Sequence, residues 1–115
     1  MPFINSKITT KVSEEKKEAV KAALGQAVNV LDKTEDWVMV NIEDQQDIWF
    51  GGKKKETAAY VGLELVGNPS GEASLDFTKK VCDIYEKELG IPKDSVYLTL
   101  KPVEGVHWGW NDQTF

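Results

Sequence analysis

The residue with the clearest chemical potential stands at the very start of the chain, which begins MPFINS. Methionine aminopeptidases generally accept a small second residue, so removal of Met1 would leave Pro2 with a free secondary amine. A general base works best when its pKa lies near the working pH, and desolvation or a nearby cation lowers the pKa of an amine. Pro2 is therefore a candidate base. The simpler alternative is that proline suits the first position of a strand, where its missing N–H costs little.

Other residue types that commonly do chemistry are scarce. The single cysteine, Cys82, excludes an intramolecular disulfide, and its place beside Val81 in a helical pattern is typical of a small core residue. His107 is the only histidine, so we expect no metal, no other cofactor, and no Ser-His-Asp or Cys-His catalytic group. The run Lys53–Lys55 follows two glycines and is typical of a solvated turn, with a local anion site as the alternative.

The composition is that of one soluble globular domain, with 115 residues of which 41% are hydrophobic and 29% charged. A net charge of −5 argues against nucleic acid as the main partner. The N-terminus lacks the pattern of a signal peptide, and no stretch is long and apolar enough to span a membrane. We therefore expect a cytoplasmic protein without membrane insertion, whose release from the cell would need a non-classical route.

Two similar units, offset by 58 residues, make up the chain. The segments DWVMVNI and DSVYLTL correspond at this offset, and both place apolar side chains with period two, as strands do. An earlier strand opens each unit, PFINSKIT in the first and AAYVGLELVG in the second, and the offset places Pro2 opposite Tyr60. We therefore expect one domain over 1–115, with repeats of about 2–58 and 59–115 that share one core and are joined by a WFGG turn.

A helix connects the two strands of each unit. The first is expected in SEEKKEAVKAALGQAVNVL, with Ser13 as the N-cap, and the second in SLDFTKKVCDIYEKELG, with Gly90 as the C-terminal stop. Apolar residues recur at helical spacing in both helices: Val20, Leu24, Ala27, Val28 and Leu31, then Phe77, Val81, Ile84, Tyr85 and Leu89. The order βαβ-βαβ with right-handed crossovers predicts an α/β fold, a four-stranded sheet with both helices on one face.

The second face of this sheet has no helix to cover it. The strands nevertheless carry large side chains on both faces, because Trp37 and Met39 alternate with valines and Tyr97 stands between Val96 and Leu98. Uncovered apolar surface of this kind is typical of an interface. An oligomer is therefore expected.

Five short motifs occur together along the chain: MPF at the start, Lys33 in LDK after the first helix, FGG at Phe50–Gly52, SVY at a strand entry, and the terminal WGWNDQTF. With these motifs the chain resembles the macrophage migration inhibitory factor family of the tautomerase superfamily. The resemblance runs nearly end to end, with about one extra residue in the loop around Asn68 to Ala73. It implies the tautomerase fold and a homotrimer whose three sheets surround a central channel, with active sites at the subunit interfaces.

The resemblance also implies an enzyme, a keto–enol tautomerase that acts on phenylpyruvate-type α-keto acids. Pro2 would be the catalytic base, and Lys33 and the backbone N–H of Leu65 would hold the substrate carboxylate. Without the resemblance, Lys33 is as well explained as a cation at a helix C-terminus. The residues implied to line the site around the aromatic end of the substrate are Trp37, Tyr97, Thr99, Trp108 and Phe115, with Tyr97 and Thr99 supplied by the neighbouring subunit. Trp110 either borders this site or packs at the interface.

Several site positions depart from the pattern of the mammalian relative. Trp37, Thr99 and Trp108 stand where that relative has tyrosine, asparagine and valine, so we expect a reshaped pocket with its own substrate preference. The segment Thr57–Tyr60 lacks the cysteines of the relative's C-x-x-C motif, which excludes redox catalysis by that route.

A receptor-binding function is the alternative to catalysis. The relative uses a separated Arg and Asp pair to mimic a chemokine motif, and Val12 and Gln45 stand at these positions here, with Lys11 and Asp44 beside them. The match is approximate. The alternative is therefore a non-catalytic trimer that signals through a cell-surface receptor.

Overall fold

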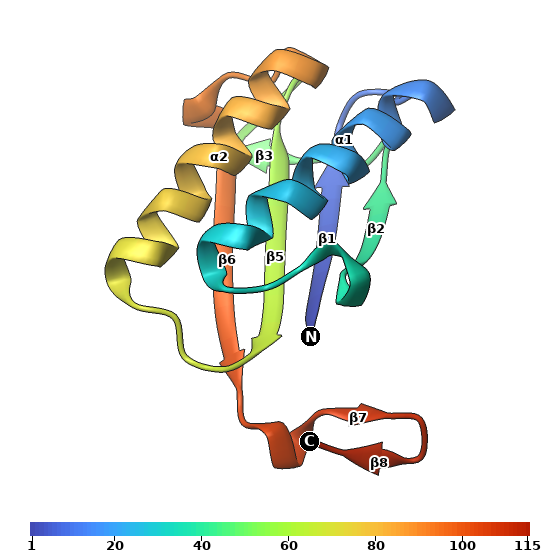
Figure 1. Ribbon diagram of the computed structural model, residues 1–115. Coiled ribbons are helices and arrows are strands. Elements are labelled where there is room, and N and C mark those ends of the chain that lie inside the picture. The colour runs from blue at the N-terminus through green and yellow to red at the C-terminus, as the bar shows by residue number, and fades with distance from the viewer.

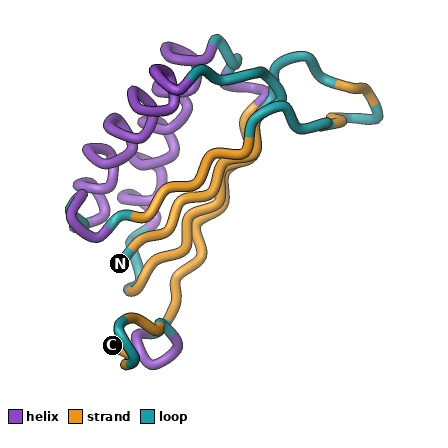
Figure 2. Tube along the Cα trace, turned by 90° about the vertical axis from the view of Figure 1, so that its right-hand side faces the viewer, coloured by secondary structure: helices purple, strands orange, loops and turns teal.

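A computed structural model describes all 115 residues, which fold into a four-stranded sheet and two long helices (Figure 1). The sheet consists of β1 (Pro2–Ile8), β2 (Met39–Glu43), β5 (Ala59–Val66) and β6 (Val96–Val103), in the spatial order β2-β1-β5-β6. The helices are α1 (Glu14–Ala27) and α2 (Gly71–Leu89). Both helices lie on the same face of the sheet (Figure 2), so the predicted α/β architecture is confirmed.

The strand directions follow the two units of the sequence. β1 runs parallel to β2, and β5 runs parallel to β6, whereas β1 and β5 are antiparallel at the centre of the sheet. The central register joins Pro2 to Leu65 and Ile8 to Ala59. Pro2 thus begins a central strand, at the end where a missing N–H disturbs the ladder least.

The core fills the space between the helices and the sheet. Side chains from β1 and β5 alternate into it, and Ile4, Ile8, Val61 and Leu63 have no exposed surface. The helix residues expected in the core are buried in the cases of Val20, Leu24, Ala27, Val28, Leu31, Phe77, Val81 and Tyr85, and partly buried in the cases of Ile84 and Leu89. The buried hydroxyls of Ser6 and Tyr85 hydrogen-bond to each other, so neither is left unpaired in the core.

Serine side chains begin both helices. The hydroxyls of Ser13 and Ser70 accept hydrogen bonds from the N–H groups of Lys16 and Ala73, each at 3.1 Å, and this satisfies donors that have no partner within the helix. The N-cap at Ser13 was predicted. The second helix begins at Gly71, earlier than the predicted start at Ser74, because Ser70 is the cap.

Matching residues of the two units are 57 positions apart up to the helix starts and 58 positions apart from the helix ends onward. Ser13 and Ser70 cap the helices, whereas the left-handed residues that end them are Asp32 (φ 58°) and Gly90 (φ 66°). An extra residue at the end of α2, between Tyr85 and Gly90, accounts for the change. Buried Pro2 therefore corresponds to the buried Ala59, and the predicted match to the exposed Tyr60 is wrong by one position.

The start of β2 and the run of lysines also differ from expectation. Residues Glu35–Trp37 form a 3-10 turn, so β2 begins only at Met39. The WFGG segment is a hairpin of β3 (Trp49–Phe50) and β4 (Lys53–Lys54), with its turn at two glycines of positive φ. The first two lysines of the run thus belong to a strand and not to the turn.

The face of the sheet opposite the helices carries aromatic residues at two corners. The Pro2 corner has Trp37 and Met39 beside the chain start, and the Tyr97 corner has Tyr97, Tyr60 and Phe50, with 5.1 Å between the ring centroids of Phe50 and Tyr97. Polar side chains lie between the corners, among them Asn5 and Asn41, which share a hydrogen bond of 2.8 Å. The expectation of an apolar second face is therefore correct for the corners only.

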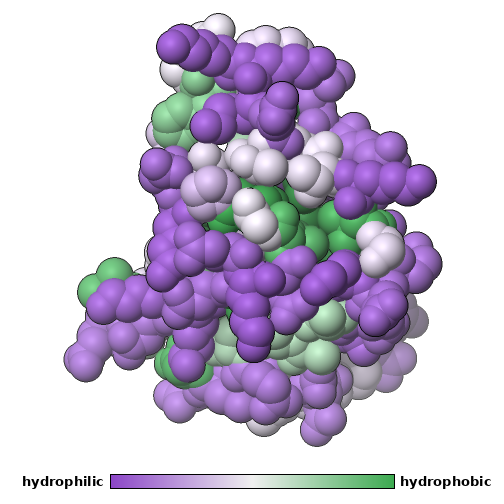
Figure 3. Space-filling view, turned by 90° about the horizontal axis from the view of Figure 1, so that it is seen from above, coloured by the Kyte–Doolittle hydropathy of each residue, from purple (hydrophilic) through white to green (hydrophobic).

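A second hairpin ends the chain. It consists of β7 (Gly109–Trp110) and β8 (Gln113–Thr114) and lies beyond the end of β6, near the chain start, while the β3–β4 hairpin projects from the opposite end of the molecule (Figures 1 and 2). Seen from above, hydrophilic side chains surround a smaller hydrophobic area (Figure 3). Neither helix has the length and apolar character that a membrane-spanning segment needs.

Candidate active site

A cleft of about 550 Å³ opens at the start of β1. Three parts of the chain line it: the chain start at Met1–Phe3, the segment Asp36–Met39 that leads into β2, and the segment Trp108–Trp110 that leads into the last hairpin. Pro2 itself is buried, while Trp37 and Trp110 remain half exposed around it. The strand pairing thus fixes the first residues of β1 in a mostly apolar hollow.

The amine at the chain start lies in an environment that disfavours its charge. In this structure the amine belongs to Met1, and burial, followed by the charge of Lys33, lowers its pKa below the ordinary value of 8.0. Lys33 stands directly after the left-handed residue that ends the first helical segment. Its Nζ is 3.7 Å from the place that a Cβ would take at Gly67, so the lysine also reaches the residue that follows β5. The structure therefore brings Lys33 and the chain start together.

A backbone donor that the sequence did not reveal faces the same place. The N–H of Val66 donates to the carbonyl of Met1 at 3.2 Å, so it would lose its partner if Met1 were removed. The N–H of Gly67 points to the opposite side of β5, where it donates to the carbonyl of Val103 on β6 at 3.3 Å. Because N–H groups alternate along a strand, the N–H of Leu65 also points towards β6. The geometry therefore favours Val66 over Leu65 as a donor to a group beside Pro2.

Aromatic side chains form the wall of the cleft. Trp37 and Trp110 meet edge to face, with 5.0 Å between ring centroids and an interplanar angle of 85°, an arrangement that aromatic rings favour. Phe115 stacks on Trp110, with 6.1 Å between ring centroids. Trp108 lines the cleft directly, whereas Phe115 belongs to the rim through Trp110. The prediction that Trp110 borders the site agrees with this geometry.

Tyr97 and Thr99 lie far from Pro2 of the same chain. Pro2 is level with Leu65 and, through β5, with Pro102, while Tyr97 is five residues further back along β6. At about 3.3 Å per residue, this is roughly 16 Å along the strand. Within one chain these two predicted lining residues therefore do not join the cleft.

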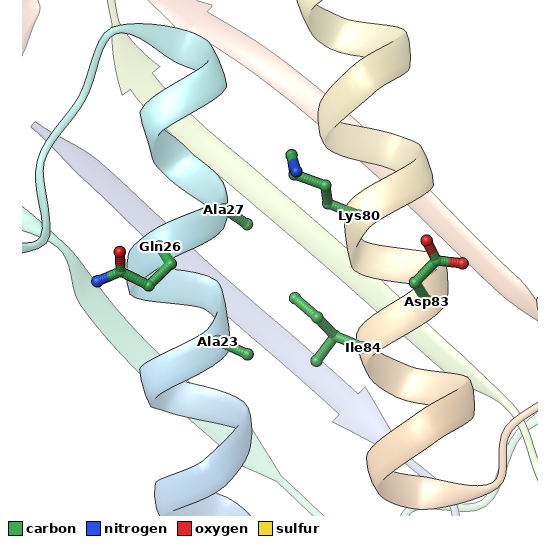
Figure 4. A pocket seen from close by; sticks show the side chains of 6 residues that line it. All are labelled: Ala23, Gln26, Ala27, Lys80, Asp83 and Ile84. Atoms are coloured by element: carbon green, nitrogen blue, oxygen red, sulfur yellow. The ribbon is translucent and has the colours of Figure 1, made fainter.

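A second hollow, of about 360 Å³, lies between the two helices, and it has a different character (Figure 4). The small side chains of Ala23 and Ala27 on α1 leave space there, and Lys80 and Ile84 of α2 point towards it. Its one carboxylate, Asp83, forms an ion pair with Lys93 at 2.6 Å. The lining of this hollow contains no amine that is partly buried beside a second cation, as the amine at the chain start is. Nowhere in the chain do three or more His, Cys, Asp or Glu side chains form a group that could hold a metal ion.

Comparison with known proteins assigns the fold and the family. The family model described as Macrophage migration inhibitory factor (MIF) matches residues 1–115. A macrophage migration inhibitory factor homolog of Trichinella spiralis is 30% identical over 115 residues, which cover 100% of both chains. The crystal structure of Leishmania major MIF2 has a TM-score of 0.91 and 30% identity, and the match covers 100% of this chain and 97% of that one.

More distant structures share the architecture. A fused 4-OT, described as a wild-type asymmetric trimer, has a TM-score of 0.86 at 15% identity, over 97% of this chain and 94% of that one. At this identity the likeness concerns the fold alone. The match of the family model to every residue is the stronger finding, and it agrees with the buried proline at the start of β1 and the lysine beside it. The chain belongs to the macrophage migration inhibitory factor family, within the tautomerase superfamily.

Proposed function

We propose that the protein is a keto–enol tautomerase that acts on phenylpyruvate-type α-keto acids, with Pro2 as the catalytic base after removal of Met1. The observation that carries the proposal is the environment of the terminal amine. Burial and the nearby charge of Lys33 lower the pKa of that amine, which keeps part of it neutral and able to accept a proton near neutral pH. Without Met1, the nitrogen of Pro2 is a secondary amine in the same cleft.

The chemistry needs one proton to move between two atoms of the substrate. In the direction of ketone formation, Pro2 takes the proton from the enol oxygen and gives it to the neighbouring carbon, as the C=C bond becomes C–C and the C–O bond becomes C=O. Lys33 pairs with the substrate carboxylate, and the N–H of Val66 donates to it from the place that the Met1 carbonyl vacates. A positioned base of this kind typically contributes 10²–10⁴-fold to the rate.

The aromatic end of the substrate then requires a second chain. The Pro2 corner and the Tyr97 corner lie at different ends of the same sheet face, so one chain's Pro2 can meet Tyr97 and Thr99 only in a neighbouring copy. A contact between two different patches closes into a ring when the rotation permits. A homotrimer with sites at its interfaces meets this requirement, and the trimers among the fold neighbours support it.

The decisive experiment follows phenylpyruvate ketonisation by ultraviolet absorbance, after intact mass has verified the loss of Met1. Pro2→Gly is expected to lower kcat by at least about 100-fold, because the glycine amine is primary and lacks the ring that fixes the nitrogen. Pro92→Gly, which changes an exposed proline before β6, is the matched control and should retain activity. A correctly processed wild-type trimer without turnover would refute the proposal.

A receptor-binding trimer without catalysis is the second candidate. Val12, at the first of the two positions compared with a receptor motif, contacts the neighbour of the second position, since the carboxylate of Asp44 accepts the N–H of Val12 at 2.9 Å. Val12 is buried, however, and the Asp44 carboxylate is already engaged, so only Lys11 and Gln45 remain exposed there. This arrangement makes catalysis the preferred function. Receptor binding that survives Pro2→Gly would establish the second one independently.

A further inference from the structure

Two hydroxyl groups at the Tyr97 corner form a hydrogen bond that the proposed reaction has not used. The phenol oxygen of Tyr60 on β5 lies 2.7 Å from Oγ1 of Thr99 on β6. The strand register sets Tyr60 opposite Tyr97 and Thr99 opposite Gly62, so the phenol reaches diagonally along the face. A Cβ at Gly62 would lie only 3.3 Å from the phenol oxygen, so glycine at this position permits the reach.

The pair is exposed, which separates it from the hydrogen bonds that hold the core. Tyr60 keeps 38% of its surface exposed, and Thr99 is exposed as well. Water could satisfy either hydroxyl at this site, so the bond adds little to the free energy of folding. Its main effect is on geometry, because a hydrogen bond with Tyr60 selects one of the three staggered rotamers of the Thr99 side chain.

The pair also has a defined capacity towards a third group. Two hydroxyls hold two hydrogens and use one of them between themselves, so one donor and several lone pairs stay free. The rings of Tyr97 and Phe50 lie beside the Tyr60–Thr99 pair and would exclude water from it once a ligand covers the two hydroxyls. A donor that loses water without gaining a partner is penalised.

We propose that Tyr60 is a positioning residue that acts through Thr99 and gives the enzyme a preference for arylpyruvates with a hydrogen-bonding group at the far end of the ring. The inference rests on the proposed function, in which this corner receives the aromatic end of a substrate bound at Pro2 of the neighbouring copy. An unsubstituted phenyl ring would cover the free donor and leave it unpaired. A ring hydroxyl would pair with it.

The test compares kcat/KM for 4-hydroxyphenylpyruvate with that for phenylpyruvate. Tyr60→Phe and Thr99→Val are each expected to reduce this ratio by about 5- to 10-fold, mainly through KM for the hydroxylated substrate. Because the two residues act as one unit, the double variant should lose no more than either single variant. Thr99→Ser keeps the hydroxyl and should retain the wild-type ratio.

Tyr85→Phe is the matched control, since it removes a phenol hydroxyl from the other hydrogen-bonded pair of hydroxyls, that of Tyr85 with Ser6, which is buried in the core. It should lower stability and leave the ratio unchanged. An unchanged ratio in Tyr60→Phe, an equal loss for both substrates, or strictly additive single losses would overturn the inference while the proposed function stands. Absence of turnover for both substrates in the wild-type protein would overturn both.

Discussion

The units β1–α1–β2 and β5–α2–β6 have the same fold, yet residues at matching positions differ in kind. Pro2 opens the first unit, whereas Ala59 takes its place in the second and lies in the core. Lys33 follows the left-handed residue that ends the first helical segment, and Ile91 follows the one that ends α2. Lys33 is half-buried beside the chain start, and Ile91 has no exposed surface. The candidate reactive positions of one unit are thus core positions of the other.

The turns that precede Lys33 and Ile91 show one physical source of the difference. The N–H of Lys33 reaches the carbonyl of Val28, and the N–H of Ile91 reaches that of Tyr85, each at 3.2 Å. Val28 and Tyr85 are matching core residues, so the second turn contains one more residue. The first helix tightens into a 3-10 segment at Val28–Leu31, while α2 continues to Leu89. Because the first helix ends in a tight 3-10 turn, Lys33 stays partly exposed. Because α2 ends with one more residue, Ile91 lies in the core.

The most severe way to break this comparison is to place the lysine of the first unit in the second. Ile91→Lys would bury an unpaired charge at a site with no exposed surface, and we expect a loss of about 3–5 kcal/mol in the free energy of unfolding. Urea unfolding followed by circular dichroism measures the loss. Ile91→Val, a change of one methylene, should cost only about 1 kcal/mol. A stable Ile91→Lys protein would mean that the two turns are interchangeable.

The reverse exchange should affect activity and spare the fold. Lys33→Ile removes the cation that lowers the pKa of the terminal amine and would pair with the substrate carboxylate. We expect kcat/KM for phenylpyruvate to fall about 10- to 100-fold, mostly through a higher KM, while unfolding changes by less than about 1 kcal/mol. Lys87→Ile, which removes the cation in the last turn of α2, is the control and should keep its activity. Equal losses in both variants would show that net charge, and not position, matters.

The left-handed residues that end the two helices allow a finer comparison. A Cβ at Gly90 would meet no atom within 4 Å, so Gly90→Ala tests backbone conformation alone. We expect a loss of about 1 kcal/mol, because alanine adopts the left-handed region at a cost of this size. Asp32→Ala should cost less than half as much, since a Cβ is already present there. Chemical denaturation of both variants under one set of conditions makes the comparison.

Much of this arrangement could be predicted from the sequence, because it depends on side-chain type and period. The alternation of apolar residues gave the strands, and Ser13 and Gly90 marked helix ends through their known capping preferences. The donor at Val66 could not be found in this way, since every residue except proline has a backbone N–H and only the β1–β5 register shows which one faces Pro2. The bond between Tyr60 and Thr99 likewise depends on a diagonal contact between strands that are distant in sequence.

Each unit also contains a carboxylate whose pKa is held low, and the causes differ. Asp44 accepts the backbone N–H of Val12 at 2.9 Å, and this hydrogen bond is the main reason that its pKa lies below the ordinary 3.8. The pKa of Asp83 is lowered chiefly by the hydrogen bond and charge of Lys93. In both cases the folded pKa is below the unfolded one. The stabilisation is therefore complete above about pH 4 and is lost as the pH falls through the lower folded value.

Salt should distinguish the two carboxylates and gives the smallest predicted effect. Asp83 is exposed and Asp44 is only partly buried, so the shifts in melting temperature will be modest. Asp83→Asn should lower the Tm at pH 6 in about 0.02 M NaCl and have almost no effect in about 1 M NaCl, where charges are screened within about 3 Å.

Asp44→Asn should lower the Tm at both salt concentrations, because the partner of the Asp44 carboxylate is a fixed backbone dipole, the N–H of Val12. It should also flatten the decline of Tm between about pH 5 and pH 3, since the amide does not titrate. If salt erased the Asp44 effect as well, the first unit would depend on the charge of Lys17, a cation that acts on that carboxylate, and not on the hydrogen bond that joins the β1–α1 loop to the end of β2.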